Sequence, residues 1–448
     1  MDANISTTLI KNVRICQTDA ILNGAVLFEQ GGKILQIITD EDQSLCSIQA
    51  NEVIDGNGCL LLPGAIDAHV HFREPGLTQK ADIASESHAA AAGGVTYVLD
   101  MPNVNPTTTT PEALAEKAHL FKEKCIVNYG IWYGITSDNI EQALQDYGQP
   151  DSPFYNEICG FKVFLGSSTG GMLMNDAQKL RQLFSQTQRI IGIHSESEDI
   201  IRRNREKYLL AEQALTANKD LNDLPISYHP KIRDVEACME TTCMAVTLAQ
   251  ETGAQLHVCH LTTAEELEYL DKVNTKNISA EVCVAHLWFS QEDYVRLGTR
   301  IKCNPAIKRL QDREALRKAL TNGQIETIGT DHAPHLLSDK QGGSLRAASG
   351  MPSIQYSVLA MLELAKQGVL PITRIVELMS ANPAKRFSLN NRGTISVGNF
   401  ADLVLVSNTE TTTVNRDNIL SKCGWSPFEG QTFSHRIMGT WVNGKKVY

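Results

Sequence analysis

Eight short apolar runs, each leading through a polar loop into an amphipathic helical segment, fill the middle of this 448-residue chain. Helical periodicity recurs between the runs, for example over 111–124, 177–187 and 235–251. Eight strand–helix units over about 320 residues predict a (β/α)8 TIM barrel with insertions. An open, doubly wound parallel sheet is the alternative that the pattern leaves open. The eight expected strands are residues 65–69, 95–101, 126–133, 160–165, 190–194, 255–260, 280–285 and 326–330.

The two ends of the chain have a different texture, with short strands and turn residues in place of helical periodicity. Such strands are expected over 8–15, 24–28 and 33–38 near the start, and over 393–395, 401–406 and 437–447 near the end. This distribution predicts one small β-sandwich domain built from both termini. We expect residues 1–62 and 389–448 to form it, with the barrel over 63–388 and a helical stretch near 371–386 leading back.

Composition excludes several classes of protein. A chain with 42% hydrophobic residues can bury a large core, and a net charge of −10 argues against a nucleic-acid partner, although a local positive pocket for a small anion stays open. We see no apolar run long enough for a membrane span and no signal peptide after Met1. The 11 scattered cysteines fit reduced thiols, so we expect a cytoplasmic protein.

The first barrel strand ends in Asp67-Ala68-His69-Val70-His71-Phe72-Arg73. Side chains two residues apart share a face of a strand, so His69 and His71 would point the same way and could hold a metal ion. Arg73 has the same parity and could offer a bidentate fork to a carboxylate beside that metal. Taken alone, the segment would favour a surface strand that carries two unrelated histidines, so the metal site depends on the rest of the chain.

Other unusual side chains also fall at the ends of expected strands, where the active sites of such barrels lie. His257 and His260 have opposite strand parity, so at most one faces the metal, and we favour His260 because it is nearer the strand end. Together with His69 and His71, the set predicts a metal centre. Its further members are Lys162 in the fourth strand, His194 in the fifth, His260 in the sixth and Asp331 after the eighth.

Lys162 lies inside an apolar strand, where a charged amine is costly to bury. It could pair with an acid or extend outward to solvent. Alternatively, the neutral amine could combine with CO₂ to give a carbamate whose two oxygens bridge two metal ions. That interpretation predicts a binuclear site.

These motifs resemble the dihydroorotases of the amidohydrolase superfamily over nearly the whole chain, from Val53-Ile54-Asp55-Gly56 to Ser426-Pro427-Phe428-Glu429-Gly430. The resemblance implies a reversible, zinc-dependent cyclisation of N-carbamoyl-L-aspartate to L-dihydroorotate in pyrimidine synthesis, and a possible homodimer. It implies one Zn²⁺ on His69, His71, Lys162 and Asp331, and a second on Lys162, His194 and His260. It further implies a carbamate on Lys162, a bridging hydroxide as nucleophile, and Asp331 as the proton shuttle.

The substrate is a finer question, because hydantoinases, dihydropyrimidinases and allantoinases resemble this metal set too. Dihydroorotate carries a ring carboxylate, which needs a cationic partner, and Arg73 is placed for it where allantoinases usually have Asn. A different cyclic-amide hydrolase is the main alternative, and a catalytically silent homologue is a further one. The resemblance assigns substrate contacts to His71, Arg73, Asn103, Asn304, His335, Ser349 and Gly350.

The expected seventh strand and the segment 336–346 are assigned no catalytic role. The expected seventh strand contains Glu281 where relatives more usually have a Pro-His-His run, and we assign it no ligand. Residues 336–346, rich in Gly, Ser and charge, are expected to form an ordinary surface loop, with a lid over the site as the alternative.

Overall fold

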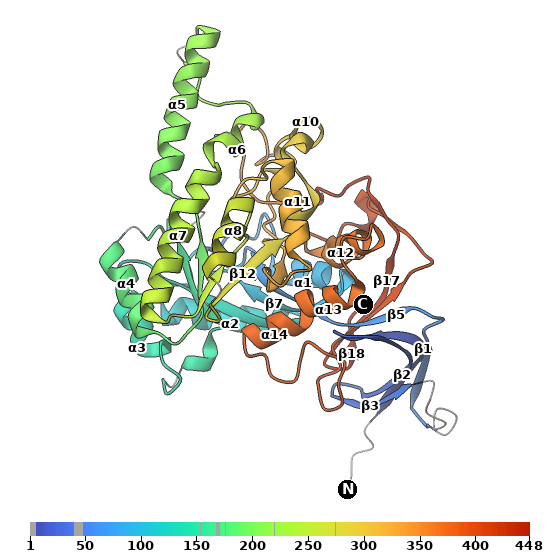
Figure 1. Cartoon of the computed structure of the whole chain (residues 1–448). Helices are drawn as coiled ribbons and strands as arrows, with labels where there is room; N and C mark the ends of the chain where they lie inside the picture. The colour runs from blue at the N-terminus through green and yellow to red at the C-terminus, as the bar shows by residue number, and fades with distance from the viewer. Residues whose placement is uncertain are drawn as a thin grey trace.

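The computed structural model describes residues 6–39, 48–152, 154–166, 171–174, 176–218, 220–273 and 275–448. A barrel of parallel strands surrounded by helices makes up most of the molecule, and a smaller curled sheet lies beside it (Figure 1). The sheet contains both the first and the last strands of the chain, so the chain enters and leaves through the small domain.

The barrel contains all eight of the expected strands. Its order follows the sequence, and each strand pairs in parallel with the next. The first and eighth strands close the barrel through the bridge between Val70 and His332 and a 2.8 Å hydrogen bond from His71 N to His332 O. The predicted (β/α)8 fold is confirmed. The strands are β6 (Ala65–Val70), β7 (Val95–Asp100), β8 (Asn128–Gly134), β9 (Gly160–Phe164), β10 (Ile191–His194), β11 (Leu256–Val258), β12 (Ile278–Cys283) and β13 (Thr327–Gly329).

Helices cover the outside of the barrel, and many begin at a side-chain cap. The hydroxyl of Thr110 and the carboxylates of Asp176 and Asp234 accept hydrogen bonds from the first turns of α2, α4 and α7. The expected helical stretch near 371–386 is present as α13, a π-turn over Glu377–Ala381, and α14. The helices are α1 (Ile83–Ala92), α2 (Pro111–Lys124), α3 (Ile140–Tyr147), α4 (Ala177–Gln186), α5 (Glu198–Thr216), α6 (His229–Ile232), α7 (Val235–Thr252), α8 (Ala264–Val273), α9 (Val284–Trp288), α10 (Tyr294–Leu297), α11 (Leu310–Ala319), α12 (Ser357–Lys366), α13 (Ile372–Val376) and α14 (Asn382–Arg386).

The small domain is one continuous sheet that curls over its own apolar core, which includes Phe28, Leu61 and Trp441. A single curled sheet therefore takes the place of the two sheets that the term sandwich implies. A short hairpin, β15 (Thr412–Thr413) with β16 (Thr432–Phe433), stands apart from it. The strands of the curled sheet are β1 (Thr7–Cys16), β2 (Ile21–Glu29), β3 (Ile34–Thr39), β4 (Glu52–Asp55), β5 (Leu60–Pro63), β14 (Leu403–Ser407), β17 (Arg436–Val442) and β18 (Lys445–Lys446).

One expected strand is wrong. Residues 393–395 form a loop, because Gly393 adopts a φ of 85° and breaks the extended backbone there. Ile395 is nevertheless buried in the core of the small domain, and Gln17 Nε2 donates a 2.7 Å hydrogen bond to its carbonyl. Ile395 therefore packs in the apolar core although it does not belong to a strand.

Among the described residues, no helix is both long enough and apolar enough to cross a membrane.

Candidate active site

A cavity of about 390 Å³ opens at the carboxyl ends of the barrel strands. Lys162 lies fully buried in β9, next to the group that faces this cavity, with its Nζ 3.1 Å from the Sγ of Cys259. The structure therefore brings the predicted site residues together. Those that line the cavity are His69, His71, Arg73, Asn103, His194, His260, Asn304, Asp331, His335, Ser349 and Gly350.

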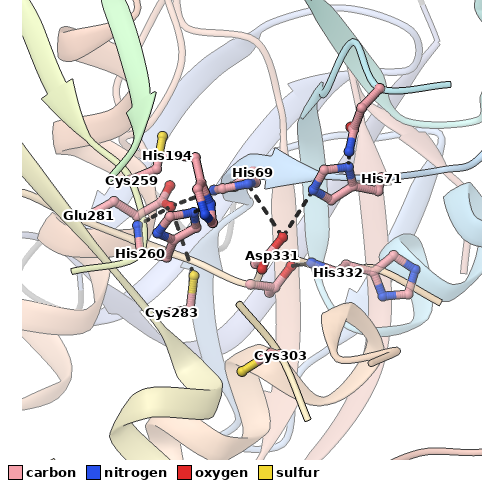
Figure 2. Close-up of polar contacts among 12 residues, drawn as sticks. His69, His71, His194, Cys259, His260, Glu281, Cys283, Cys303, Asp331 and His332 are labelled. Carbon is pink, nitrogen blue, oxygen red and sulfur yellow. Dashed lines mark hydrogen bonds and ion pairs between the residues drawn. The ribbon is translucent and has the colours of Figure 1, made fainter. Parts of the chain in front are cut away.

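His69, His71 and Asp331 form one group whose ligand atoms are close enough to share a metal ion. The Oδ1 of Asp331 lies 3.4 Å from His69 Nε2 and 3.0 Å from His71 Nε2. Figure 2 shows both rings directed at this carboxylate. Two imidazole nitrogens and a carboxylate oxygen are ordinary ligands of Zn²⁺, so the donor set fits such an ion.

The far nitrogen of each of these rings faces an oxygen acceptor. His69 Nδ1 lies 2.9 Å from Glu281 Oε1, and His71 Nδ1 lies 2.7 Å from Asn103 Oδ1. An acceptor at Nδ1 places the hydrogen there and leaves Nε2 for a metal ion on the Asp331 side. Both rings are thus held in the orientation and tautomer that a metal ligand needs.

A second pair of imidazoles lies beside His69. His194 Nδ1 and His260 Nε2 are 2.9 Å apart (Figure 2). His194 Nε2 donates to Glu196 Oε2 at 3.0 Å, and Arg233 also bonds that carboxylate. Because the hydrogen of His194 is on Nε2, its Nδ1 lone pair faces His260, as it would if both rings shared one cation.

Burial keeps most of these imidazoles neutral. It lowers the pKa of His71 to about 3, although Asp331 opposes the shift. The pKa of His260 is lowered well below its usual value by burial and by the neighbouring His194, and burial lowers the pKa of His194 too, against the effect of Glu196. Metal ligation requires neutral imidazole, so these rings are in the state that a metal ion would bind.

His69 differs, because two carboxylates flank it. Burial and Lys162 both lower its pKa, but Asp331 and Glu281 outweigh them and raise it to about 10. Burial would raise the pKa of Asp331, yet His69 and His71 lower it to about 2. The two carboxylates thus favour a positive charge at His69, and a metal ion between His69 and Asp331 would supply one.

Lys162 has neither of the two ordinary roles considered for it. Its side chain is fully buried, and no carboxylate of the described residues lies within 4.0 Å of its amine. It lies close enough to His69, His194, His260 and Asp331 to affect the pKa of each, so it is near both groups of imidazoles.

Arg73 lies on the other side of His71 and is buried without an acid. Its Nε donates to the carbonyl of Pro334 at 3.1 Å, and its Nη2 lies 3.1 Å from His335 Nε2. Within the described part of the chain, no carboxylate comes within 4.0 Å of the guanidinium. Burial lowers its pKa to about 10, so it still carries its charge at neutral pH. A buried cation of this kind, with hydrogen-bond donors on the cavity side, can take an anion from a bound ligand.

The sequence analysis did not identify the two carboxylates that accept hydrogen bonds from the candidate ligands, Glu281 on His69 and Glu196 on His194. Glu281 lies in β12, the strand to which no role was assigned, and Glu196 follows His194 by two residues. A charged residue inside an apolar strand is the same signal that identified Lys162, so Glu281 could have been found. Its partner His69 is 212 residues away, which only the fold reveals.

The amidohydrolase family model matches residues 60–190 and 228–447. The chain belongs to this family. The dihydroorotase of Methanosarcina mazei is 34% identical to this amidohydrolase over 435 residues, covering 94% of this chain and 90% of that protein. An allantoinase of Bacillus velezensis is 31% identical, covering 96% and 94%. The solved L-hydantoinase (dihydropyrimidinase) from Arthrobacter aurescens has a TM-score of 0.88 at 26% identity, over 99% of this chain and 96% of that one.

Proposed function

We propose that this amidohydrolase acts on a cyclic amide and is a dihydroorotase, interconverting N-carbamoyl-L-aspartate and L-dihydroorotate in pyrimidine biosynthesis. The observation that carries the proposal is Arg73, a buried guanidinium beside the candidate metal ligands with no acid of the described residues against it. The ring of dihydroorotate bears a carboxylate, whereas hydantoin and dihydrouracil bear none. A fixed cation in the cavity therefore favours dihydroorotate.

The other predicted contacts surround the same space. Asn103 uses its oxygen on His71, so its amide N–H groups are left to donate to the substrate carboxylate beside Arg73. Burial, Arg73 and Lys80 lower the pKa of His335, so its ring is neutral beside the guanidinium of Arg73. Asn304, Ser349 and Gly350 line the remaining wall and would contact the ring.

The residues present fit two Zn²⁺ ions. His69, His71 and Asp331 would hold one and His194 with His260 the other, with a CO₂-derived carbamate on Lys162 shared by both. Two ions held there would supply a nucleophilic water at neutral pH and polarise the amide carbonyl. The full burial of the Lys162 amine, with no carboxylate of the described residues within 4.0 Å and with the Sγ of Cys259 at 3.1 Å, supports the carbamate, which would supply an anionic ligand near both groups of imidazoles.

Asp331 is the residue that would move a proton. Its low pKa makes it a carboxylate at neutral pH, and its Oδ1 faces the site between His69 and His71. It can take a proton during attack on the ring carbonyl and return it to the departing ring nitrogen. The same two transfers in reverse close the ring, as a reversible reaction requires.

The relatives leave two rival activities, an allantoinase and a hydantoinase or dihydropyrimidinase. A silent homologue is a weaker rival, since the chain retains every proposed ligand. We further propose a cytoplasmic enzyme acting on a small molecule, and the ten described cysteines, all free thiols, fit a reducing compartment. The homodimer implied by the resemblance stays a prediction.

The substrate test compares ring opening of L-dihydroorotate, dihydrouracil, hydantoin and allantoin by the zinc-loaded protein and by Arg73→Ala. We expect efficient turnover of dihydroorotate alone. Loss of the charged fork should cost about 3 kcal/mol of substrate binding, which is roughly a 100-fold rise in KM. Arg202→Ala, on the exposed face of α5, is the matched control and should leave KM unchanged.

Equal turnover of the neutral rings, or an Arg73→Ala variant with the KM of the wild type, would show that Arg73 does not select the substrate. Preferred turnover of allantoin would replace the proposal with an allantoinase. No turnover of any ring by a protein that binds zinc stoichiometrically would favour the silent homologue.

A further inference from the structure

Lys340 is a second buried cation near the cavity, and its side chain is only 2% exposed. Its Nζ donates three hydrogen bonds, to the carbonyls of Lys302 at 3.0 Å, Ala348 at 2.7 Å and Gly350 at 2.7 Å. An ammonium group has three hydrogens, so all are used. No carboxylate of the described residues lies within 4.0 Å of it, so its charge is met by these backbone carbonyls and by the ring of Trp425, whose centroid lies 6.0 Å from Nζ.

The three carbonyls belong to two segments that form one wall of the cavity. Lys302 begins the segment that leads to Asn304, and Ala348 and Gly350 flank Ser349. Gly350 N also donates to Lys302 O at 2.8 Å, and the side chain of Lys302 bonds the carbonyl of Ala347. The segments 302–304 and 347–350 are therefore cross-linked, and Lys340 joins both through one atom.

No other common side chain can reproduce this arrangement. The ammonium of lysine is the one common side-chain group with three donors on a single atom, at the end of a long aliphatic stem. Removing it leaves the carbonyls of Ala348 and Gly350 without this donor, and a buried carbonyl without a partner is costly. The two segments would then shift to find other partners.

We propose that Lys340 is a positioning residue that holds Asn304 and the Ser349–Gly350 backbone in register for the substrate ring. The inference rests on the proposed function for the identity of that ring, but not for the cross-link itself. Lys340 is not a catalytic residue, because its ammonium is directed at carbonyls behind the wall. Its loss should weaken substrate binding much more than it slows the chemical step.

The test uses Lys340→Met, which keeps the stem and removes all three donors, and Lys340→Gln, which keeps two. The exposed Lys272→Met in α8 is the matched control. With L-dihydroorotate, we expect KM of the Met variant to rise at least tenfold while kcat stays within threefold, with the Gln variant in between. Hydrogen–deuterium exchange should increase in peptides covering 302–304 and 347–350 and remain unchanged elsewhere in the barrel.

The outcomes separate this inference from the proposed function. An unchanged KM together with unchanged exchange at both segments would overturn the inference, as would a fall in kcat at constant KM. If the wild type does not turn over dihydroorotate, the proposed function fails, and the exchange measurement still decides whether Lys340 holds the wall. If the Met variant does not fold, the Gln variant carries both measurements.

Discussion

At the scale of single residues, the site depends on backbone conformations that side chains rarely adopt. Arg73, His260 and Asp331 have φ values of 67°, 39° and 47°, in the left-handed region, and each follows the end of a barrel strand. Such residues cost of order 1–3 kcal/mol each, and they gather at functional sites. The turns direct these side chains across the mouth of the barrel instead of along the strand. His260, which we favoured over His257 because it is nearer the strand end, lies in the turn after β11 and lines the cavity.

The substitution Glu281→Gln tests the carboxylate that supports the candidate ligand His69. The carboxylate fixes His69 through Nδ1 and raises its affinity for positive charge, so an amide should weaken the metal site without removing any ligand. We expect Zn²⁺ affinity to fall about 10- to 100-fold, measured by competition with a chromophoric chelator. The surface variant Glu268→Gln in α8 should bind zinc as the wild type does. Equal zinc affinity for Glu281→Gln and the wild type would mean that His69 needs no such support.

At the scale of elements, the sequence was sufficient to predict the barrel strands but not the contacts between residues that are distant along the chain. The eight strands were predictable because strands buried on both faces are mostly apolar, as β9 and β10 are apart from Lys162 and His194. The ends of the strands then predicted candidate ligands, which the structure brings together around one cavity. The sequence could have marked Glu281 as unusual, but the partners of Glu281 and of Lys340 were not predictable, since only the fold brings them near. The segment 336–346, expected as a surface loop, contributes Ser344 and Leu345 to the cavity wall and is hydrogen-bonded to Asp223 on the connection that follows α5.

That attachment predicts a pH-dependent stability. Asp223 accepts hydrogen bonds from the backbone N–H groups of Gly343 at 2.6 Å and Leu345 at 2.9 Å. Burial alone would raise its pKa, but these bonds outweigh burial and lower it. A carboxyl whose pKa is lowered on folding stabilises the protein above its unfolded pKa of about 3.9, and this contribution is lost as the pH falls through the folded value.

We therefore expect Asp223→Asn to lower Tm by about 2 °C at pH 7, with the difference from the wild type shrinking as the pH falls below 4. Differential scanning calorimetry across this range would measure it. The exposed Asp271→Asn in α8 should show no such pH-dependent difference. A constant difference at all pH values would assign the effect to the shape of the side chain and not to its charge.

At the scale of the whole molecule, the small sheet and the barrel are joined by buried polar contacts. Asp402 lies at the start of β14 and accepts from the backbone N–H of Asn443 at 2.7 Å, from Asn128 Nδ2 of barrel strand β8, and from Arg392. Its own carbonyl accepts from Gly64 N, between β5 and β6. Asp402 thus connects the C-terminal strands to the residue before β6 and to β8. We therefore expect that the small sheet does not unfold independently of the barrel.

Asp402→Ala tests this coupling. The change leaves the guanidinium of Arg392 and the amide of Asn128 without their buried acceptor, and loss of one partner of a buried pair costs about 3 kcal/mol. Because the contacts span both domains, we expect a lower Tm with a single calorimetric transition, and earlier proteolysis in both domains together. The exposed Asp417→Ala, in the same C-terminal part of the chain, should unfold as the wild type does. Two separated transitions in Asp402→Ala would show instead that the sheet and the barrel are independent folding units, held together at this residue alone.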